Sequence, residues 1–135
     1  MKNRVAITAV VLVALTLVTA AGAGTTTATT SWGLQVPTSG QTLYVTFVIS
    51  STAPVVPYEY AIQNTCAYPK AHFTLGQRDD ITAWTDTDPA TGNPQVTMPV
   101  YLQSVPADAN CKVSLVSKNT VVKGSTQTYT VAAAP

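Results

Sequence analysis

The chain has 135 residues, of which 46% are hydrophobic and only 10% are charged, with a formal net charge of +1. Soluble domains usually have about 25% charged residues, and disordered chains are poor in hydrophobic ones, so this composition favours one folded domain over a disordered chain. Without Lys2 and Arg4, which lie in a segment expected to be removed, five basic residues face six acidic ones. No basic patch remains, which argues against a nucleic-acid partner.

The N-terminus, residues 1–23, has the layout of a secretory signal peptide. Lys2 and Arg4 precede an apolar run from Val5 to Ala20, and small residues follow, so cleavage is expected after Ala23. The run is shorter than the roughly 20 residues that cross a bilayer comfortably. Two alternatives retain it, as a permanent membrane anchor or, after a pilin-type cut near Arg4, as a helix in a filament core. The favoured interpretation places the protein outside the cell or on its surface.

This order of an apolar segment and then a Thr-rich region with strand patterns is similar to the layout of small archaeal pilins. The resemblance is one of layout and includes no specific motif. It implies a retained helix that forms the core of a surface filament. Gly22 and Gly24 depart from the pattern, because they suit a peptidase better than a helix that continues into a stalk.

Residues 24–37 are expected to lead into the domain. Thr25 to Ser31 is almost entirely Thr and predicts a flexible or glycosylated stretch. The apolar side chains that follow on one parity are Trp32, Leu34 and Val36. We predict that they form a donor strand that completes the sheet of a neighbouring copy, because alternate apolar side chains can fill an acceptor groove. The alternative is that the same residues form the first strand of their own sandwich.

The longest strand pattern is Thr42 to Ser50, which contains neither Gly nor Pro. Apolar residues occupy one parity (Leu43, Val45, Phe47, Ile49), and the other parity holds Tyr44, Thr46, Val48 and Ser50. A period of two with β-branched and aromatic residues is typical of a strand buried on at least one face. We therefore expect this strand at the centre of a sheet.

Shorter strand patterns follow along the chain, separated by turns. They cover Tyr58–Ile62, Ala71–Leu75, Ile81–Thr85, Val96–Leu102, Cys111–Leu115, Thr120–Lys123 and Thr126–Ala132, with turns expected at Gly76–Asp80 and Asp86–Pro94. Pro99 indicates an edge strand or a bulge, because proline cannot donate to a ladder. Eight or nine short strands at this spacing predict an all-β fold, an immunoglobulin-like antiparallel β-sandwich over residues 38–135.

Cys66 and Cys111 are the two cysteines, and in an exported chain two cysteines most often pair. Their bond would close a loop of 45 residues and stabilise the fold by about 3 to 5 kcal/mol. Trp84 lies between them, as in immunoglobulin domains, but Ala109 stands where the tyrosine corner of those domains has Tyr. We therefore predict the architecture and not membership of that family.

Four acidic residues, Asp79, Asp80, Asp86 and Asp88, are the weak candidates for a calcium site. The spacing differs from that of an EF-hand, and Asp also begins and caps turns, so turn formation is the favoured interpretation. No cofactor is expected.

Catalytic residues are scarce. The one histidine, His72, is expected on the polar side of a strand, and Glu59 is the one glutamate. Neither belongs to a recognisable catalytic motif, so the sequence predicts no enzyme.

The aromatic residues Tyr58, Tyr60 and Trp84 offer a sugar-stacking surface if they share one sheet face. Core packing explains the same residues equally well. Low charge, abundant Thr and a strand apolar on both parities favour a structural subunit of an extracellular filament or coat that forms a homopolymer. The alternatives are a secreted carbohydrate-binding or adhesin module with surface glycans as partners, and a pilin with a retained helix.

Overall fold

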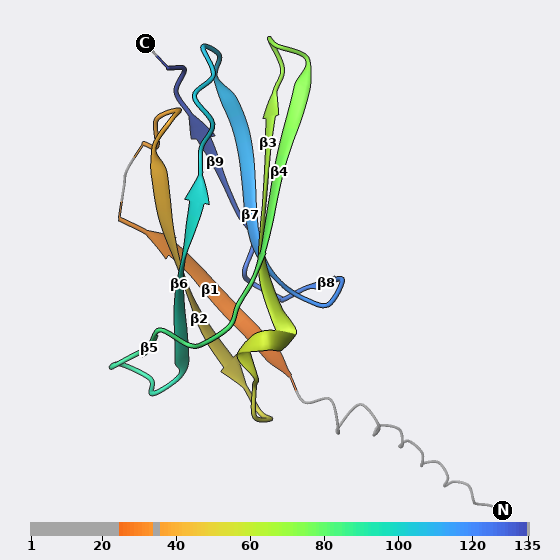
Figure 1. Ribbon diagram of the computed structural model, residues 1–135. Helices are drawn as coiled ribbons and strands as arrows, with labels where there is room; N and C mark the ends of the chain where they lie inside the picture. Colours follow the sequence, from red (N-terminus) through yellow and green to blue (C-terminus); the bar gives the residue numbers. More distant parts are fainter. Residues whose placement is uncertain (1–24, 34–35, 135) are drawn as a thin grey trace, which may run out of the picture.

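The computed structural model describes residues 25–33 and 36–134, which form two antiparallel β-sheets packed face to face (Figure 1). The first sheet has the order β1-β2-β6-β5, made of β1 (Thr26–Trp32), β2 (Thr42–Ser51), β6 (Pro94–Tyr101) and β5 (Asp86–Thr87). The second has the order β4-β3-β7-β8, made of β4 (Phe73–Asp80), β3 (Tyr60–Tyr68), β7 (Ala109–Ser117) and β8 (Thr120–Val121), and β9 (Gln127–Val131) also pairs with β7. The predicted all-β sandwich is confirmed.

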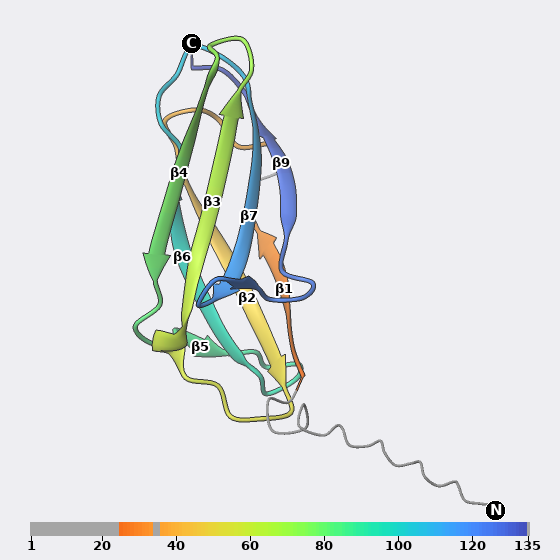
Figure 2. The ribbon, with the colours of Figure 1, turned by 90° about the vertical axis from the view of Figure 1, so that its right-hand side faces the viewer.

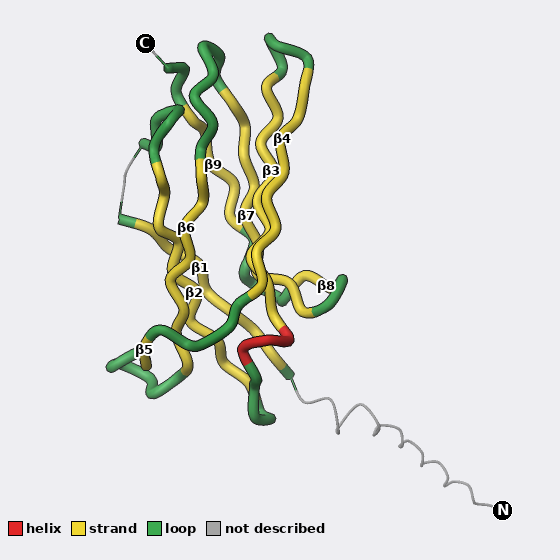
Figure 3. Tube along the Cα trace, viewed as in Figure 1, coloured by secondary structure: helices red, strands yellow, loops and turns green. Residues whose placement is uncertain are grey.

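The strand order is that of an immunoglobulin-like fold. In that fold strands A, B, E and D form one sheet, and C, F and G form the other. In the first sheet, the places of A, B, E and D are taken by β1, β2, β6 and β5. In the second, the places of C and F are taken by β3 and β7, and β8 and β9, which both pair with β7, together take the place of G. β4 adds one strand next to β3. A single turn of 3-10 helix, η1 (Pro57–Glu59), precedes β3 (Figure 3).

β2 lies between β1 and β6 and supplies the centre of the core. Its apolar parity (Leu43, Val45, Phe47, Ile49) is fully buried, whereas the opposite parity is exposed or half-buried. The buried side chains belong to one core with residues of the second sheet, among them Ile62, Val113 and Leu115. Apolar residues alternate along β2 because one face of the strand packs against the second sheet, as the sequence pattern predicts.

Thr25–Ser31 was expected to be a flexible or glycosylated stretch. The expectation of flexibility is wrong, because these residues form most of β1. β1 pairs with β2 along its whole length, from Thr26 opposite Ser51 to Trp32 opposite Val45. Val36, expected to face inward, is 65% exposed, and Leu34 lies outside the described residues. Thr is β-branched and suits a strand that has one open face, so a Thr run is not a sign of flexibility here. The first strand of the sandwich is thus β1, which includes Trp32 but not Val36. The exchange of this segment with a neighbouring copy stays a prediction.

Two further element boundaries differ from the sequence expectation. β4 continues through Gly76–Asp80, where a turn was expected, and these residues pair with Ala61–Thr65 of β3. Ile81–Thr85 forms no strand, and the short strand β5 lies within the expected turn at Asp86–Pro94. β4 is an edge strand whose half-buried side continues after Leu75 with the polar residues Gln77 and Asp79, and these hide the apolar alternation used to recognise strands.

The two long sides of the sandwich differ. On one side, the backbone N–H of Ala28 donates to the carbonyl of Lys123 and that of Ser39 to the carbonyl of Ala132, both at 3.0 Å. On the other side, β4 and β6 are not paired as strands. Figure 2 shows β1 and β9 along the first side and β4 along the opposite one. We call the β4–β6 side the open seam.

Candidate functional site

The predicted disulfide between Cys66 and Cys111 is present. The two residues lie directly opposite each other on β3 and β7, with their Cα atoms 4.1 Å apart, and both side chains are buried in the core. The bond therefore joins neighbouring strands of one sheet, unlike the bond between the two sheets of antibody domains. A disulfide is consistent with an oxidising compartment outside the cytosol.

The four candidate calcium ligands are not gathered into one site. Asp79 accepts a hydrogen bond from the Gln77 side chain at 2.6 Å, Asp86 from the backbone of Thr87, and Asp88 from the Thr91 hydroxyl. Asp80 follows Asp79 on β4 and so points to the opposite face. In residues 25–33 and 36–134, no three His, Cys, Asp or Glu side chains are placed to hold a metal ion. Asp86 and Asp88 organise turns, as Asp commonly does.

His72 and Glu59, the single histidine and glutamate, are exposed, and Glu59 lines a shallow surface pocket together with Asp80. His72 lies in the turn before β4, with a positive φ of 59°, and not on the strand expected from the sequence. Glu59 lies in η1.

The predicted sugar-stacking set does not form one surface. Tyr60 faces the core, with 6% of its surface exposed, and packs on Trp84 with ring centroids 5.8 Å apart. Tyr58 is 73% exposed but lies in η1 and not on a sheet. The expectation is wrong because β3 begins at Tyr60 on its inward parity, so the core covers the ring.

The outer face of the first sheet carries a different pair of exposed tyrosines. Tyr44 on β2 is 62% exposed and lies opposite Pro99, and Tyr101 on β6 is 58% exposed and lies opposite Thr42. Tyrosine alternation on β2 was visible in the sequence, but the register of β2 against β6 was not. Because diagonal neighbours on adjacent strands lie about 7 to 8 Å apart, the two rings share one region of the surface.

We call this surface the tyrosine–threonine face. Its outward residues are Thr27, Thr29 and Ser31 on β1, Thr42, Tyr44, Thr46, Val48 and Ser50 on β2, and Gln95, Thr97, Pro99 and Tyr101 on β6. The hydroxyls of Thr46 and Thr97 lie 2.9 Å apart and form a hydrogen bond between the strands. None of these twelve side chains is charged. The face therefore has low desolvation cost and two aromatic contact points.

Comparison with models of known protein families, with curated proteins and with solved structures gave no match. In the described part of the chain there is no helix that is long and apolar enough to cross a membrane. The expected signal peptide and its alternatives, at residues 1–23, lie outside the described residues.

Proposed function

We propose that this protein is a structural subunit of an extracellular filament or surface coat and that it packs through its tyrosine–threonine face. The observation that carries the proposal is the absence of charge from twelve outward positions on β1, β2 and β6, together with the exposure of Tyr44 and Tyr101. The centres of protein interfaces are poor in charged residues and rich in aromatic ones.

The composition of the whole chain supports assembly with a second copy over binding to a charged partner. Only 10% of residues are charged, so a neighbouring copy presents little charge that would have to be desolvated. The disulfide agrees with export, and the apolar N-terminal residues supply either a signal peptide or, as in the archaeal pilins that the layout resembles, a filament core. In both cases the β-sandwich is the part exposed to the outside.

The test is the assembly state of the exported protein, measured by light scattering and negative-stain electron microscopy. We expect the wild type to form oligomers or fibres, and Tyr44→Lys and Tyr101→Lys to remain folded monomers, because a buried unpaired lysine opposes packing. Tyr58→Lys is the control, since Tyr58 is even more exposed than Tyr44 and Tyr101 but lies off the face. A monomeric wild type, or fibres unchanged in both face variants, would contradict the proposal.

The fate of the N-terminus separates two forms of this function. A mature chain that begins near Gly24 indicates a subunit held by the sandwich alone, whereas one that begins near Val5 indicates a pilin with a retained helix. Mass spectrometry of the native N-terminus distinguishes them.

A further inference from the structure

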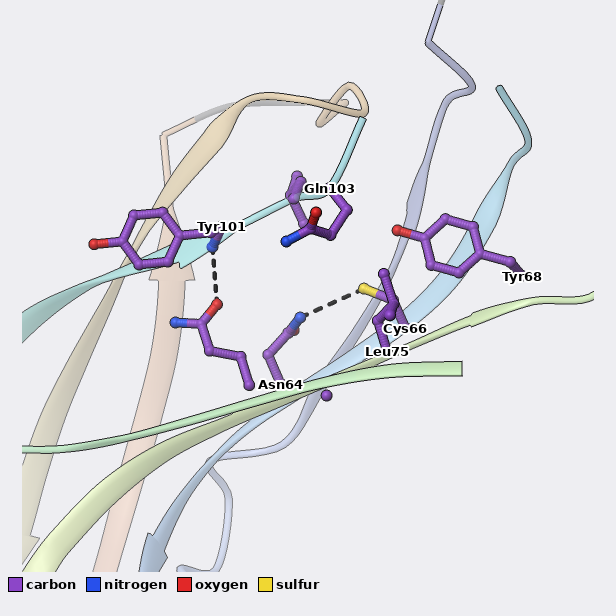
Figure 4. Close-up of a pocket in the computed structure, with 9 residues that line it drawn as sticks. Asn64, Cys66, Tyr68, Leu75, Tyr101 and Gln103 are labelled. Atoms are coloured by element: carbon purple, nitrogen blue, oxygen red, sulfur yellow. Dashed lines mark hydrogen bonds between the residues drawn. The ribbon is translucent and has the colours of Figure 1, made fainter. Parts of the chain in front are cut away.

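A cavity of about 190 Å³ lies at the open seam, between β3 and β4 of the second sheet and the end of β6 (Figure 4). Asn64, Cys66 and Leu75 lie along one side of it, and Tyr101 and Gln103 lie across from them. Since one water molecule takes about 30 Å³ of liquid, the cavity has room for several. None of the residues that line it is charged.

Asn64 brings an incompletely bonded amide group to this cavity. The residue is 4% exposed, and its Oδ1 accepts a hydrogen bond from the Tyr129 hydroxyl. Its Nδ2 has two N–H groups, but in the described part of the chain its contact is with the Cys66 sulfur at 3.4 Å. Sulfur is a weak acceptor, and a buried donor without an oxygen or nitrogen partner is costly. The Nδ2 group thus lacks an oxygen or nitrogen acceptor among residues 25–33 and 36–134.

Tyr68 brings a second buried polar group. Its side chain is 1% exposed, and its ring stacks on Phe73 with centroids 4.8 Å apart. The hydroxyl end of the ring is turned toward Cys66 and Gln103 (Figure 4). It makes no hydrogen bond within residues 25–33 and 36–134, and burial raises the pKa of this phenol. Buried tyrosine hydroxyls usually have a hydrogen-bond partner. The Tyr68 hydroxyl, like the Asn64 amide, lacks such a partner among the described residues.

We propose that the cavity binds one neutral sugar ring, a hexopyranose unit of a surface glycan. Asn64 Nδ2 and the Tyr68 hydroxyl contact the sugar hydroxyls in the interior, and the exposed carboxamide of Gln103 contacts them at the mouth. Sugar hydroxyls both donate and accept, which suits an amide N–H and a phenol together. Leu75 and Leu102 provide an apolar wall for the C–H face of the ring.

The absence of charge and the size of the cavity define the ligand class. An anionic or cationic ligand would enter without an opposite charge to compensate its desolvation. A longer glycan extends out of the seam, because the cavity holds about one ring. The site shares Tyr101 with the tyrosine–threonine face, but Asn64 and Tyr68 belong to the inner face of the second sheet, and Tyr44 does not line the cavity. A substitution at Tyr44 therefore tests assembly without changing the lining of the cavity.

The experiment is a nuclear magnetic resonance titration of the ¹⁵N-labelled Tyr44→Lys variant, which carries the cavity unchanged and is expected to be monomeric. The probes are methyl α-D-mannopyranoside, methyl β-D-glucopyranoside and methyl β-D-galactopyranoside, each raised to high millimolar concentration. We expect at least one to produce saturable shifts of the Asn64 side-chain amide signals and of the Gly76 backbone amide, because both residues line the cavity.

Tyr68→Phe tests the assigned contact in the same background. The substitution removes a hydroxyl that has no hydrogen-bond partner among the described residues, so the melting temperature should not fall, whereas sugar affinity should fall about two- to tenfold. Tyr58→Phe, which removes an exposed hydroxyl on η1, should leave the affinity unchanged. The proposal is overturned if none of the three glycosides gives saturable shifts and the cavity holds only ordered water. Equal affinity in Tyr68→Phe and the parent would also overturn it.

Discussion

The side chain of Gln77 takes the place of a strand beside Pro99. From β4, its Nε2 donates to the carbonyl of Pro99 at 2.9 Å, and its Oε1 accepts from the backbone N–H of Tyr101 at 2.9 Å. The edge of β6 that faces away from β2 is thereby occupied at the open seam. Pro99 has no N–H, so this edge has one fewer donor to satisfy. Pro99 was predicted to indicate an edge strand or a bulge. β6 lies between β2 and β5, but β5 pairs with it only at Pro94 and Gln95, so the Pro99 end of β6 has a strand on one side alone.

Gln77→Ala should destabilise the protein by about 1 to 3 kcal/mol, because it leaves the Tyr101 N–H and the Pro99 carbonyl without partners. It should also increase aggregation, since an unprotected strand edge pairs with other chains. Denaturant unfolding and light scattering measure the two effects. Gln63→Ala on the exposed face of β3 is the control, with an expected change below about 0.5 kcal/mol. Equal effects of the two substitutions would show that the bridge is unimportant.

Gly124→Ala should weaken the side of the sandwich opposite the open seam, where Ala28 of β1 bonds to Lys123. Gly124 has a φ of +85°, and an added Cβ would lie 2.8 Å from the carbonyl oxygen of Ala28 on β1. Gly92 is the matched control, since it has a φ of +76° but open space around it. We expect about 1 kcal/mol of destabilisation for Gly92→Ala from backbone strain alone. Gly124→Ala should cost at least about 1 kcal/mol more, measured by denaturant unfolding. A smaller loss at Gly124 than at Gly92 would contradict this explanation.

Stability should fall in alkaline solution because of Tyr129. Burial, as the largest cause, raises the pKa of Tyr129 from 10.0 to about 12. The folded protein therefore holds this proton more tightly than the unfolded chain. The contribution is complete below pH 10, and about 2 to 3 kcal/mol is lost as the pH rises through 12.

Denaturant unfolding from neutral pH to about 12 measures this loss. Burial also raises the pKa of Tyr60 and of Tyr68, and both add to the slope. The difference between the wild type and Tyr129→Phe isolates the contribution of Tyr129. If the two proteins lose stability equally with pH, the assignment to Tyr129 is wrong.

Replacing both Cys66 and Cys111 with Ala should lower the free energy of unfolding by about 3 to 5 kcal/mol, because the bond closes a 45-residue loop. The wild type should lose a similar amount in a reducing agent, and the double variant should not respond to it. Mass analysis without reduction should find the two cysteines joined within one chain. A reducing agent that leaves the wild type unchanged would rule out a stabilising bond.

The sequence alone determined the fold class and the inner face of β2. Leu43, Val45, Phe47 and Ile49 occupy one parity of the strand, and a period of two has one structural solution when one face must be buried. The pairing of Cys66 with Cys111 followed from there being two cysteines in a chain expected to be exported. These features depend on local pattern and composition, which the sequence carries directly.

The tertiary structure alone decided which side chains meet across strands and sheets. Tyr44 and Tyr101 share a surface because of the β2–β6 register, and Tyr60 is buried because β3 begins on its inward parity. Gln77 bridges the seam from a segment that reads as a turn, and β1 forms from a Thr run that reads as a linker. Each outcome depends on residues distant in the chain, because a strand is stabilised by its neighbours in the sheet and not by its own sequence alone.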